Sequence, residues 1–338
     1  MRFFSDNTAT ACPEILTALE GANRGLAKPY GEDEWTARLD GAFSAFFGTE
    51  ARAFAVATGT AANSLSLATL SPPYGAIFAH QEAHIAVDEC GAPGFFSGGA
   101  QLALLAGEHG RLQAATFRAA LGAYPPGDVH KVQPAALSIT QATELGTCYR
   151  REPLAELCAI AHERGLKVHM DGARFANALA FLGCHPADIT WRAGVDVLSF
   201  GATKNGALAA EAVVFFDAAL VGDFELRRKR AGHLLSKSRY VAAQLLAYLE
   251  TGVWRRNAGR ANALAQAIGR AAGAALLHPV EANEVFVGLG AERRRALRAA
   301  GFEFYDWGPE SAGDARFVAS WDQPEGDVPA LCEALGRS

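Results

Sequence analysis

One lysine, Lys204, lies between two apolar runs that are rich in β-branched and aromatic residues. Residues 195–200 and 212–216 have the length and composition of buried strands, and the glycines near Lys204 allow the chain to turn between them. We therefore predict that a tight loop at the end of a core strand carries Lys204. Partial burial disfavours the charged form of an amine and lowers its pKa, so this lysine could form a Schiff base with a carbonyl. A solvated surface lysine is the alternative, and a second, independent element is needed to decide.

An aspartate, Asp171, follows a short strand predicted at 166–170 and precedes a helical pattern that runs to about residue 182. An acid at the carboxyl end of a strand in an α/β sheet points into the crevice where ligands bind. Pyridoxal phosphate enzymes need such a carboxylate, because it keeps the pyridine nitrogen protonated and makes the ring an electron sink. Lys204 and Asp171 together therefore indicate a pyridoxal phosphate site. A helix N-cap role for Asp171 stays open as the alternative.

A phosphate-binding turn is the third element that such a site needs. Residues 52–58 are predicted to form a strand, Gly59 and Thr60 a turn, and residues 61–70 a helix. A helix that begins after a small-residue turn presents free backbone N–H groups and the positive end of its dipole to an anion. The turn that begins at Thr58 is therefore a candidate phosphate site, although an ordinary strand-to-helix loop has the same pattern.

A histidine, His84, follows the strand predicted at 75–80, so its imidazole would reach the same edge of the sheet as Thr58 and Asp171. There it could stack on an aromatic cofactor or move a proton near neutral pH. A lone histidine is more often structural, so this role depends on the neighbouring residues.

Strands and helices alternate from residue 52 to residue 216, which predicts an α/β fold with a mostly parallel central sheet covered on both faces. The other elements predicted in this part and before it are strands 101–106 and 130–140, and helices 13–20, 35–47, 112–121 and 153–164.

The character of the sequence changes after residue 216. Two long helices are followed by short strands that alternate with helices. We predict two domains, an N-terminal arm with a large domain at 1–245 and a small α+β domain at 246–338. The elements predicted here are one long helix at 223–249, a helix at 254–277, strands 284–288 and 315–321, and helices 291–300 and 328–335.

Composition excludes several classes of protein. Half of the 338 residues are hydrophobic, and the net charge of −5 mixes both signs, which argues against nucleic acid as a partner. The six cysteines have neither CxxC nor metal-ligand spacing, so we expect buried thiols in a reducing compartment and no metal site. No stretch has the length and hydropathy of a signal peptide or a transmembrane span, which predicts a cytoplasmic protein without a membrane partner.

Short motifs occur along the whole chain in a specific order. They are Ser5-Asp-Asn-Thr, Tyr30-Gly-Glu-Asp, Thr58-Gly-Thr-Ala-Ala-Asn63, His84-Ile-Ala-Val-Asp88-Glu-Cys-Gly-Ala-Pro, Gln141-Ala-Thr-Glu-Leu-Gly-Thr, His169-Met-Asp-Gly-Ala-Arg174, Gly201-Ala-Thr-Lys-Asn-Gly206, Gly232-His-Leu-Leu-Ser-Lys-Ser-Arg-Tyr and Ala315-Arg316-Phe-Val. The set resembles the low-specificity L-threonine aldolases among the fold-type I pyridoxal phosphate enzymes, with the L-allo-threonine and 3-phenylserine aldolases as close variants. One departure is Ala57, where many relatives have Ser, and a turn that binds phosphate through backbone N–H groups should tolerate it.

The resemblance implies a role for each matching residue. Pyridoxal 5'-phosphate would be the cofactor, attached to Lys204, with Asp171 at the ring nitrogen and His84 stacked on the ring. The other residues implied at the cofactor are Thr58, Gly59, Thr60, Arg174, Thr203, Arg230 and Lys237. The residues implied at the substrate are Ser5, Tyr30, Asp88, Arg174 and Arg316.

The implied reaction is the cleavage of a 3-hydroxy amino acid, such as threonine, into glycine and an aldehyde. Arg174 and Arg316, with Ser5, would hold the substrate carboxylate, for which a planar guanidinium is well shaped. This orientation favours cleavage of the Cα–Cβ bond over decarboxylation. His84 or His130 would take the proton of the β-hydroxyl. Because family members share their sites across a dimer interface, commonly within a tetramer, a homodimer or homotetramer is expected.

Three alternatives stay open at this point. Another enzyme with the same cofactor, such as an aminotransferase, a β-eliminating lyase or a serine hydroxymethyltransferase-like enzyme, would use a similar lysine and aspartate. A non-catalytic protein could retain the fold as a scaffold, although the presence of every reactive residue argues against it. A nucleotide-binding α/β protein is disfavoured, because the chain has neither a P-loop lysine pattern nor a G-x-G-x-x-G turn before a helix.

Overall fold

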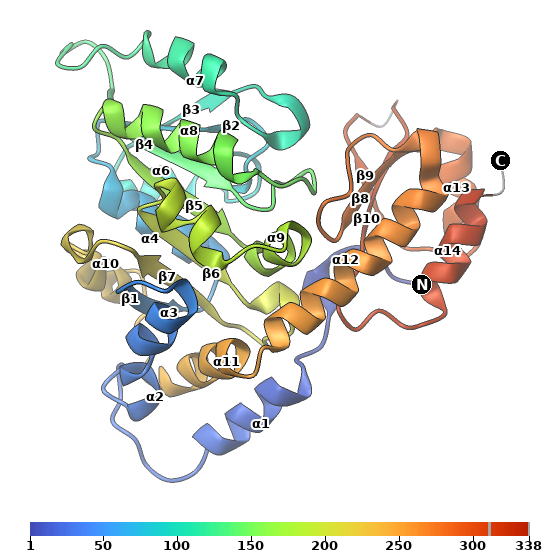
Figure 1. Cartoon of the computed structure of the whole chain (residues 1–338), viewed down its shortest axis with the longest axis horizontal. Helices are drawn as coiled ribbons and strands as arrows, with labels where there is room; N and C mark the ends of the chain where they lie inside the picture. Colours follow the sequence, from blue (N-terminus) through green and yellow to red (C-terminus); the bar gives the residue numbers. More distant parts are fainter. Residues whose placement is uncertain (310–311, 337–338) are drawn as a thin grey trace.

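The computed structural model describes residues 1–309 and 312–336 and contains two β-sheets (Figure 1). Parallel pairing joins five neighbouring strands of the larger sheet, whereas its strand β7 (Glu211–Phe215) is antiparallel to both of its neighbours. The predicted α/β fold with a mostly parallel sheet is therefore confirmed. The order of the seven strands is β1 (Arg52–Val56), β7, β6 (Val197–Gly201), β5 (Lys167–Gly172), β4 (Gln133–Thr140), β2 (Gly75–His80) and β3 (Gln101–Leu105).

Helices cover both faces of this sheet. Along β7, Val213 and Val214 point to opposite faces and join different hydrophobic cores, as the two-residue period of a strand requires. The helix α4 (Gly59–Leu70) adds Leu65 to the core with Val213, and α8 (Arg151–Glu163) adds Leu157 to the core with Val214. The other helices up to the end of the sheet are α1 (Pro13–Ala22), α2 (Glu34–Ala37), α3 (Leu39–Phe47), α5 (His84–Val87), α6 (Ala92–Ser97), α7 (Ala114–Leu121) and α9 (Phe175–Leu182).

A smaller antiparallel sheet follows towards the C-terminus, in the order β8 (Glu284–Gly288), β10 (Asp314–Val318) and β9 (Tyr305–Trp307). The long helix α12 (Val253–Ala272) contacts α9 of the large part and also β8, so it runs from one part of the molecule to the other (Figure 1). A small α+β part is thus present, and the division at residue 245 stays a prediction. The remaining helices are α10 (Phe224–Arg230), α11 (Arg239–Glu250), α13 (Ala291–Ala299) and α14 (Asp327–Gly336).

The single helix predicted over 223–249 is wrong. The chain forms α10 and α11 there, because Gly232 adopts a left-handed conformation with φ of +80°, through which a helix does not continue. The helix predicted over 35–47 is likewise divided into α2 and α3 at Arg38. The sequence interpretation missed β9 and α6, which are too short to produce a recognisable period.

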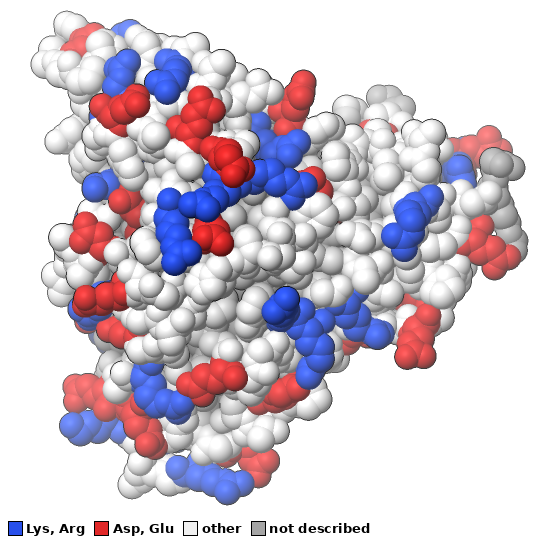
Figure 2. All heavy atoms as spheres, in the orientation of Figure 1, with Lys and Arg blue, Asp and Glu red and all other residues white. Residues whose placement is uncertain are grey.

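The surface carries basic and acidic side chains side by side, as Figure 2 shows for one face. This agrees with the mixed charge of the sequence. No helix in the described part of the chain is both long and apolar enough to cross a membrane. Among residues 1–309 and 312–336, no cluster of histidine, cysteine or acidic residues has the make-up of a metal site.

An aromatic cluster fixes β6, the strand that leads to Lys204. Phe200, near the end of β6, is 1% exposed, and its ring centroid lies 5.2 Å from that of Phe43 and 6.0 Å from that of Tyr248. Phe175, the first residue of α9, also contacts it, with centroids 6.1 Å apart. Rings at these spacings in edge-on or tilted arrangements stabilise a core beyond the area that they bury.

We expect Phe200→Ala to lower the free energy of unfolding by about 3–5 kcal/mol, because it opens a cavity within this cluster. Urea denaturation followed by circular dichroism would measure the change. Phe95→Ala is the matched control, since the Phe95 side chain is 79% exposed and its removal should change the unfolding free energy by less than about 0.5 kcal/mol. Similar losses in both variants would contradict the assignment of Phe200 to the core.

Candidate active site

A cavity of about 250 Å³ lies at the edge of the large sheet where its parallel strands end. Thr58 follows β1, Asp171 lies at the end of β5, and Lys204 follows β6. Because these three strands run in the same direction, the three residues lie at the same edge of the sheet. Because β7 runs in the opposite direction, its first residue, Glu211, also lies at this edge. The cavity is lined by Asn7, Ala57, Thr58, Gly59, Thr60, Asn63, His84, Asp171, Ala173, Thr203, Lys204 and Glu211.

The amino end of α4 forms one end of this cavity. Thr58 is the N-cap of α4, and its Oγ1 accepts a hydrogen bond from the Ala61 amide at 3.2 Å. The amides of Gly59 and Thr60 precede the first intrahelical hydrogen bond, so they stay available to a ligand. A Cβ on Gly59 would meet nothing within 4 Å, which means that the space beside its backbone is open. This end of the cavity can therefore hold an anion such as a phosphate.

Hydrogen bonds made by Asn205 and Asn257 hold the loop that carries Lys204 in place. The Asn205 side chain donates to the Tyr248 hydroxyl at 2.6 Å and to the Trp254 carbonyl at 2.8 Å. The Asn257 amide in turn donates to the Asn205 carbonyl at 3.0 Å. The Lys204 amine lines the cavity, and its charge helps to lower the pKa of the buried Asp6 carboxylate.

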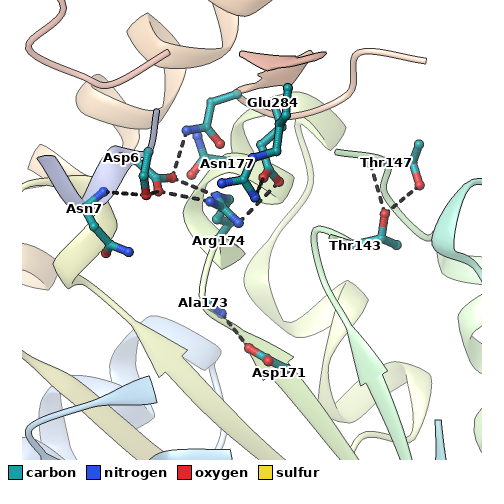
Figure 3. Close-up of polar contacts among 12 residues, drawn as sticks. Asp6, Asn7, Thr143, Thr147, Asp171, Ala173, Arg174, Asn177 and Glu284 are labelled. Atoms are coloured by element: carbon teal, nitrogen blue, oxygen red, sulfur yellow. Dashed lines mark hydrogen bonds and ion pairs between the residues drawn. The ribbon is translucent and has the colours of Figure 1, made fainter. Parts of the chain in front are cut away.

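A hydrogen-bonded chain connects Asp171 with His84. The Asn63 side chain donates to Asp171 Oδ2 and to Glu89 Oε1, both at 2.8 Å, and His84 Nδ1 lies 2.9 Å from the same Glu89 oxygen. The Ala173 amide donates to the other Asp171 oxygen at 3.0 Å (Figure 3). The hydrogen bond to Glu89 raises the pKa of His84, against the effect of its burial. Burial raises the pKa of Glu89. These hydrogen bonds therefore fix the orientation of the Asp171 carboxylate and of the His84 imidazole.

A buried ion pair lies beside the cavity, between the N-terminal segment and the start of α9 (Figure 3). Arg174 donates from Nε and Nη2 to the two carboxylate oxygens of Asp6, at 2.7 and 3.0 Å. Burial would raise the pKa of Asp6, but the charges of Arg174 and Lys204 and two hydrogen bonds lower it to about 2. Burial would lower the pKa of Arg174, but Asp6 and Glu284 raise it above its ordinary value. The two groups are therefore both charged at neutral pH.

The second arginine implied by the resemblance lies in the small sheet. Arg316, on β10, donates to the Phe4 carbonyl at 3.3 Å, and its guanidinium carbon lies 5.4 Å from the ring centroid of Tyr305. Its Nη1 is 3.9 Å from Glu284 Oε1, while Arg174 Nη1 is 3.3 Å from Glu284 Oε2. One buried carboxylate therefore links the two arginines. Neither arginine lines the cavity that holds Lys204.

Of the residues singled out from the sequence, the structure brings seven together around one cavity. They are Thr58, Gly59, Thr60, His84, Asp171, Thr203 and Lys204. Ser5 lies next to Asp6, where its Oγ accepts a hydrogen bond from the Asn7 amide at 3.2 Å. The roles of all these residues stay predictions, since their positions alone do not establish what they do.

Five predicted residues lie away from this cavity. Tyr30, Arg230 and Lys237 are exposed, and the Tyr30 ring is 4.3 Å from the amine of Lys229. Asp88 is exposed in a neighbouring hollow. His130 is exposed in the connection that precedes β4, and so lies at the opposite edge of the sheet from Asp171. None of these residues lines the cavity of its own chain.

Several polar residues of the site were not assigned a role from the sequence. Glu211 could have been noticed, because an acid that opens a strand of apolar residues is rarely buried without a function. Asn63 gave no local signal, since its partners Glu89 and Asp171 lie far away in the sequence. The others are Asp6, Asn7, Asn283 and Glu284, whose contacts depend on how distant segments meet.

Comparison with known proteins agrees with this geometry. Residues 2–292 match the beta-eliminating lyase family. The chain is 45% identical to the low specificity L-threonine aldolase of Pseudomonas sp. (strain NCIMB 10558) over 334 residues, which cover 98% of this chain and 95% of that protein. The solved threonine aldolase of Leishmania major has a TM-score of 0.92 and 26% identity, covering 99% of this chain and 98% of that one. The serine palmitoyltransferase of S. paucimobilis, solved with a bound pyridoxal phosphate–myriocin aldimine, shares the fold at 19% identity, with a TM-score of 0.71 over 99% of this chain and 86% of its own.

Fold, cavity and relatives together define a pyridoxal phosphate enzyme of the lyase class. The chain belongs to the beta-eliminating lyase family and, within it, to the low specificity L-threonine aldolases.

The residues of the cavity fit pyridoxal phosphate. The free amides and the open space at Gly59 suit its phosphate, and the Lys204 amine and the Asp171 carboxylate line the same cavity, as the aldehyde and the ring nitrogen require. In the described residues, Asn63 Oδ1 and Glu89 Oε2 are buried polar atoms without a partner, which marks this region as one where a bound group adds contacts.

Glu211 makes the folding stability of the protein depend on pH. Burial raises the pKa of Glu211 from 4.5 to about 7, so the folded chain binds this proton more tightly than the unfolded chain does. Stability is therefore lost as pH rises from about 4.5, and the full penalty applies above about 7. We expect Glu211→Gln to remove this penalty, so its unfolding free energy relative to wild type should rise by about 2 kcal/mol between pH 5 and pH 8.

Urea denaturation of the cofactor-free protein at several pH values would measure this change. Glu156→Gln, at an exposed position of α8, is the matched control and should keep a constant difference from wild type. A constant difference for Glu211→Gln as well would mean that Glu211 ionises normally in the folded protein.

Proposed function

We propose that the protein cleaves L-threonine, L-allo-threonine and related 3-hydroxy-L-α-amino acids, such as 3-phenylserine, reversibly into glycine and an aldehyde. The observation that carries this proposal is that a lysine amine, a buried carboxylate and the amino end of a helix line one cavity. Arg174 directly follows Ala173 of this lining and is linked to Arg316 through Glu284. The names of the Pseudomonas and Leishmania relatives support the same reaction.

The cofactor, when bound, supplies an electron sink for the bond that breaks. Lys204 would hold its aldehyde carbon, and the charge of Asp171 would keep its ring nitrogen protonated. Gly59 and Thr60 would donate their free amides to its phosphate. Thr203, whose Oγ1 accepts a hydrogen bond from the Ala210 amide at 3.1 Å, would contribute at the same end.

Arg174 and Arg316 would hold the substrate carboxylate, together with Ser5. Arg174 is fixed by its two hydrogen bonds to Asp6, and Arg316 by the Phe4 carbonyl, so both guanidinium groups are oriented before a ligand arrives. A carboxylate held in this way limits rotation about the bond between the amine nitrogen and Cα. The bond that then stands in the reactive orientation is the one between Cα and Cβ.

His84 is the titratable imidazole inside the cavity, and we propose that it takes the proton of the β-hydroxyl, directly or through a water. Its hydrogen bond to Glu89 holds the ring and raises its pKa above the ordinary value of an imidazole. His130 lies at the other edge of the sheet and does not line this cavity.

We propose a homodimer or homotetramer with shared sites. This would give a use to Tyr30, Arg230 and Lys237, which are exposed and do not reach the cavity of their own chain. Arg230 and Lys237 would then approach the phosphate in a neighbouring copy. A monomeric mass by light scattering at micromolar concentration would contradict this proposal.

The second candidate function is β-elimination, which the description of the matching family favours. The same lysine and carboxylate could promote loss of a β-substituent instead of cleavage between Cα and Cβ. An aminotransferase is a more distant possibility for this site. The products distinguish all three reactions.

We expect L-threonine incubated with the cofactor-loaded protein to give glycine and acetaldehyde in equal amounts. Lys204→Ala should reduce the rate of cleavage by at least about 1000-fold, because the amine that binds the aldehyde group of the cofactor is lost. Chromatography of amino acids and derivatised carbonyl compounds would measure both products. The formation of 2-oxobutyrate and ammonia as main products would instead establish β-elimination and contradict the proposal.

A second test locates the cofactor. Borohydride reduction of the loaded protein should fix the cofactor permanently on the peptide that contains Lys204, and peptide mass spectrometry would identify it. The peptide with the exposed Lys237 is the internal control and should stay unlabelled. Label on any other lysine, with Lys204 unmodified, would exclude the assignment.

A further inference from the structure

A third charged residue, Glu284, lies between the two arginines that are proposed to hold the substrate carboxylate. Its side chain is fully buried on β8, with Oε2 at 3.3 Å from Arg174 Nη1 and Oε1 at 3.9 Å from Arg316 Nη1. In the described part of the chain, neither of its oxygens accepts a hydrogen bond. Figure 3 shows Glu284 and Asp6 on opposite sides of the Arg174 guanidinium. Glu284 is therefore close to both guanidinium groups without accepting a hydrogen bond from either.

The charges of this cluster balance when Glu284 is ionised. Asp6 and Glu284 then carry two negative charges, and Arg174 and Arg316 carry two positive ones. A substrate carboxylate that binds here adds a negative charge to a region where burial makes an unpaired charge costly. The arrangement becomes neutral again if one of the two acids takes up a proton.

Asp6 is not suited to take up that proton. Its carboxylate receives two hydrogen bonds from Arg174 and a third, at 2.9 Å, from the Asn283 side chain. These bonds are made to the ionised form and hold it in place. Glu284, which lacks them, is the acid that can change its state.

We propose that Glu284 is a positioning residue that occupies the arginine pair in the free enzyme and takes up a proton when the carboxylate of an amino acid binds there. This inference rests on the proposed function, in which Arg174 and Arg316 hold that carboxylate. The proton comes from solvent and is released again when the ligand leaves, so no other reactant is consumed. The affinity for the substrate then depends on how readily the Glu284 carboxylate is protonated.

The surroundings of Glu284 favour this change of state. Burial raises its pKa, while Arg174 and Arg316 oppose this effect. Two further acids, Glu144 from the loop after β4 and Asp6, raise its pKa as well. The helix α12, which also packs against β8, buries only uncharged residues. When a ligand carboxylate competes for the arginines, the two groups that oppose protonation are engaged elsewhere, so the pKa of Glu284 should rise further.

The test is proton uptake, measured by calorimetry of glycine binding to the cofactor-loaded protein in two buffers of different ionisation enthalpy. Glu284→Gln cannot take up a proton, so near neutral pH we expect wild type to bind up to about one proton more per site than this variant. The ratio of the glycine dissociation constants, wild type over variant, should also rise with pH. Glu281→Gln is the matched control, because Glu281 pairs with Arg150 outside the cluster and should leave the proton count unchanged.

A measurement on the wild type alone covers the case of a variant that does not fold. The infrared difference spectrum on glycine binding should gain the band of a protonated carboxylic acid. Equal proton counts in wild type and Glu284→Gln, or no such band in wild type, would overturn the inference while glycine binding stays intact. A wild-type protein that fails to bind glycine would instead overturn the proposed function.

Discussion

A buried guanidinium has to be paired, and the pairing of Arg174 holds the parts of this molecule together. The arginine lies between the end of β5 and the start of α9, its bidentate partner Asp6 belongs to the N-terminal segment, and Glu284 belongs to the small sheet. A charge so deeply buried would be strongly destabilising if either the segment or the sheet moved away. The ion pairs therefore fix the positions of the N-terminal segment and the small sheet relative to the large sheet.

The same constraint divides the site into two electrostatic regions. Guanidinium groups gather where the N-terminal segment meets the small sheet, whereas the chain from Asp171 through Asn63 to Glu89 lies on the side of the large sheet. The second region suits a protonated ring nitrogen. The first region would accept a carboxylate once Glu284 no longer occupies the arginines. Lys204 lines the cavity at the edge of the large sheet.

Much of this arrangement could be predicted from the sequence, because it depends on local patterns. Buried strands with apolar composition, and residues that follow them at one edge of the sheet, were enough to bring Thr58, Asp171 and Lys204 together. The break between α10 and α11 was missed, since the apolar spacing continues across Gly232 and only the backbone conformation ends the helix. The ion pair between Asp6 and Arg174 could not be foreseen as a pair, because the two residues are 168 positions apart and only the folded chain brings them together.

Arg174 and Arg316 are proposed to recognise the carboxylate of the substrate. The most direct measurement compares the binding of glycine with that of glycinamide, in which a neutral amide replaces the carboxylate, by absorbance titration of the cofactor-loaded protein. Because charge-assisted hydrogen bonds to the arginines would be lost, glycine should bind at least about tenfold more tightly than glycinamide. Equal affinity for the two compounds would contradict the claim and separate Arg174 and Arg316 from substrate recognition.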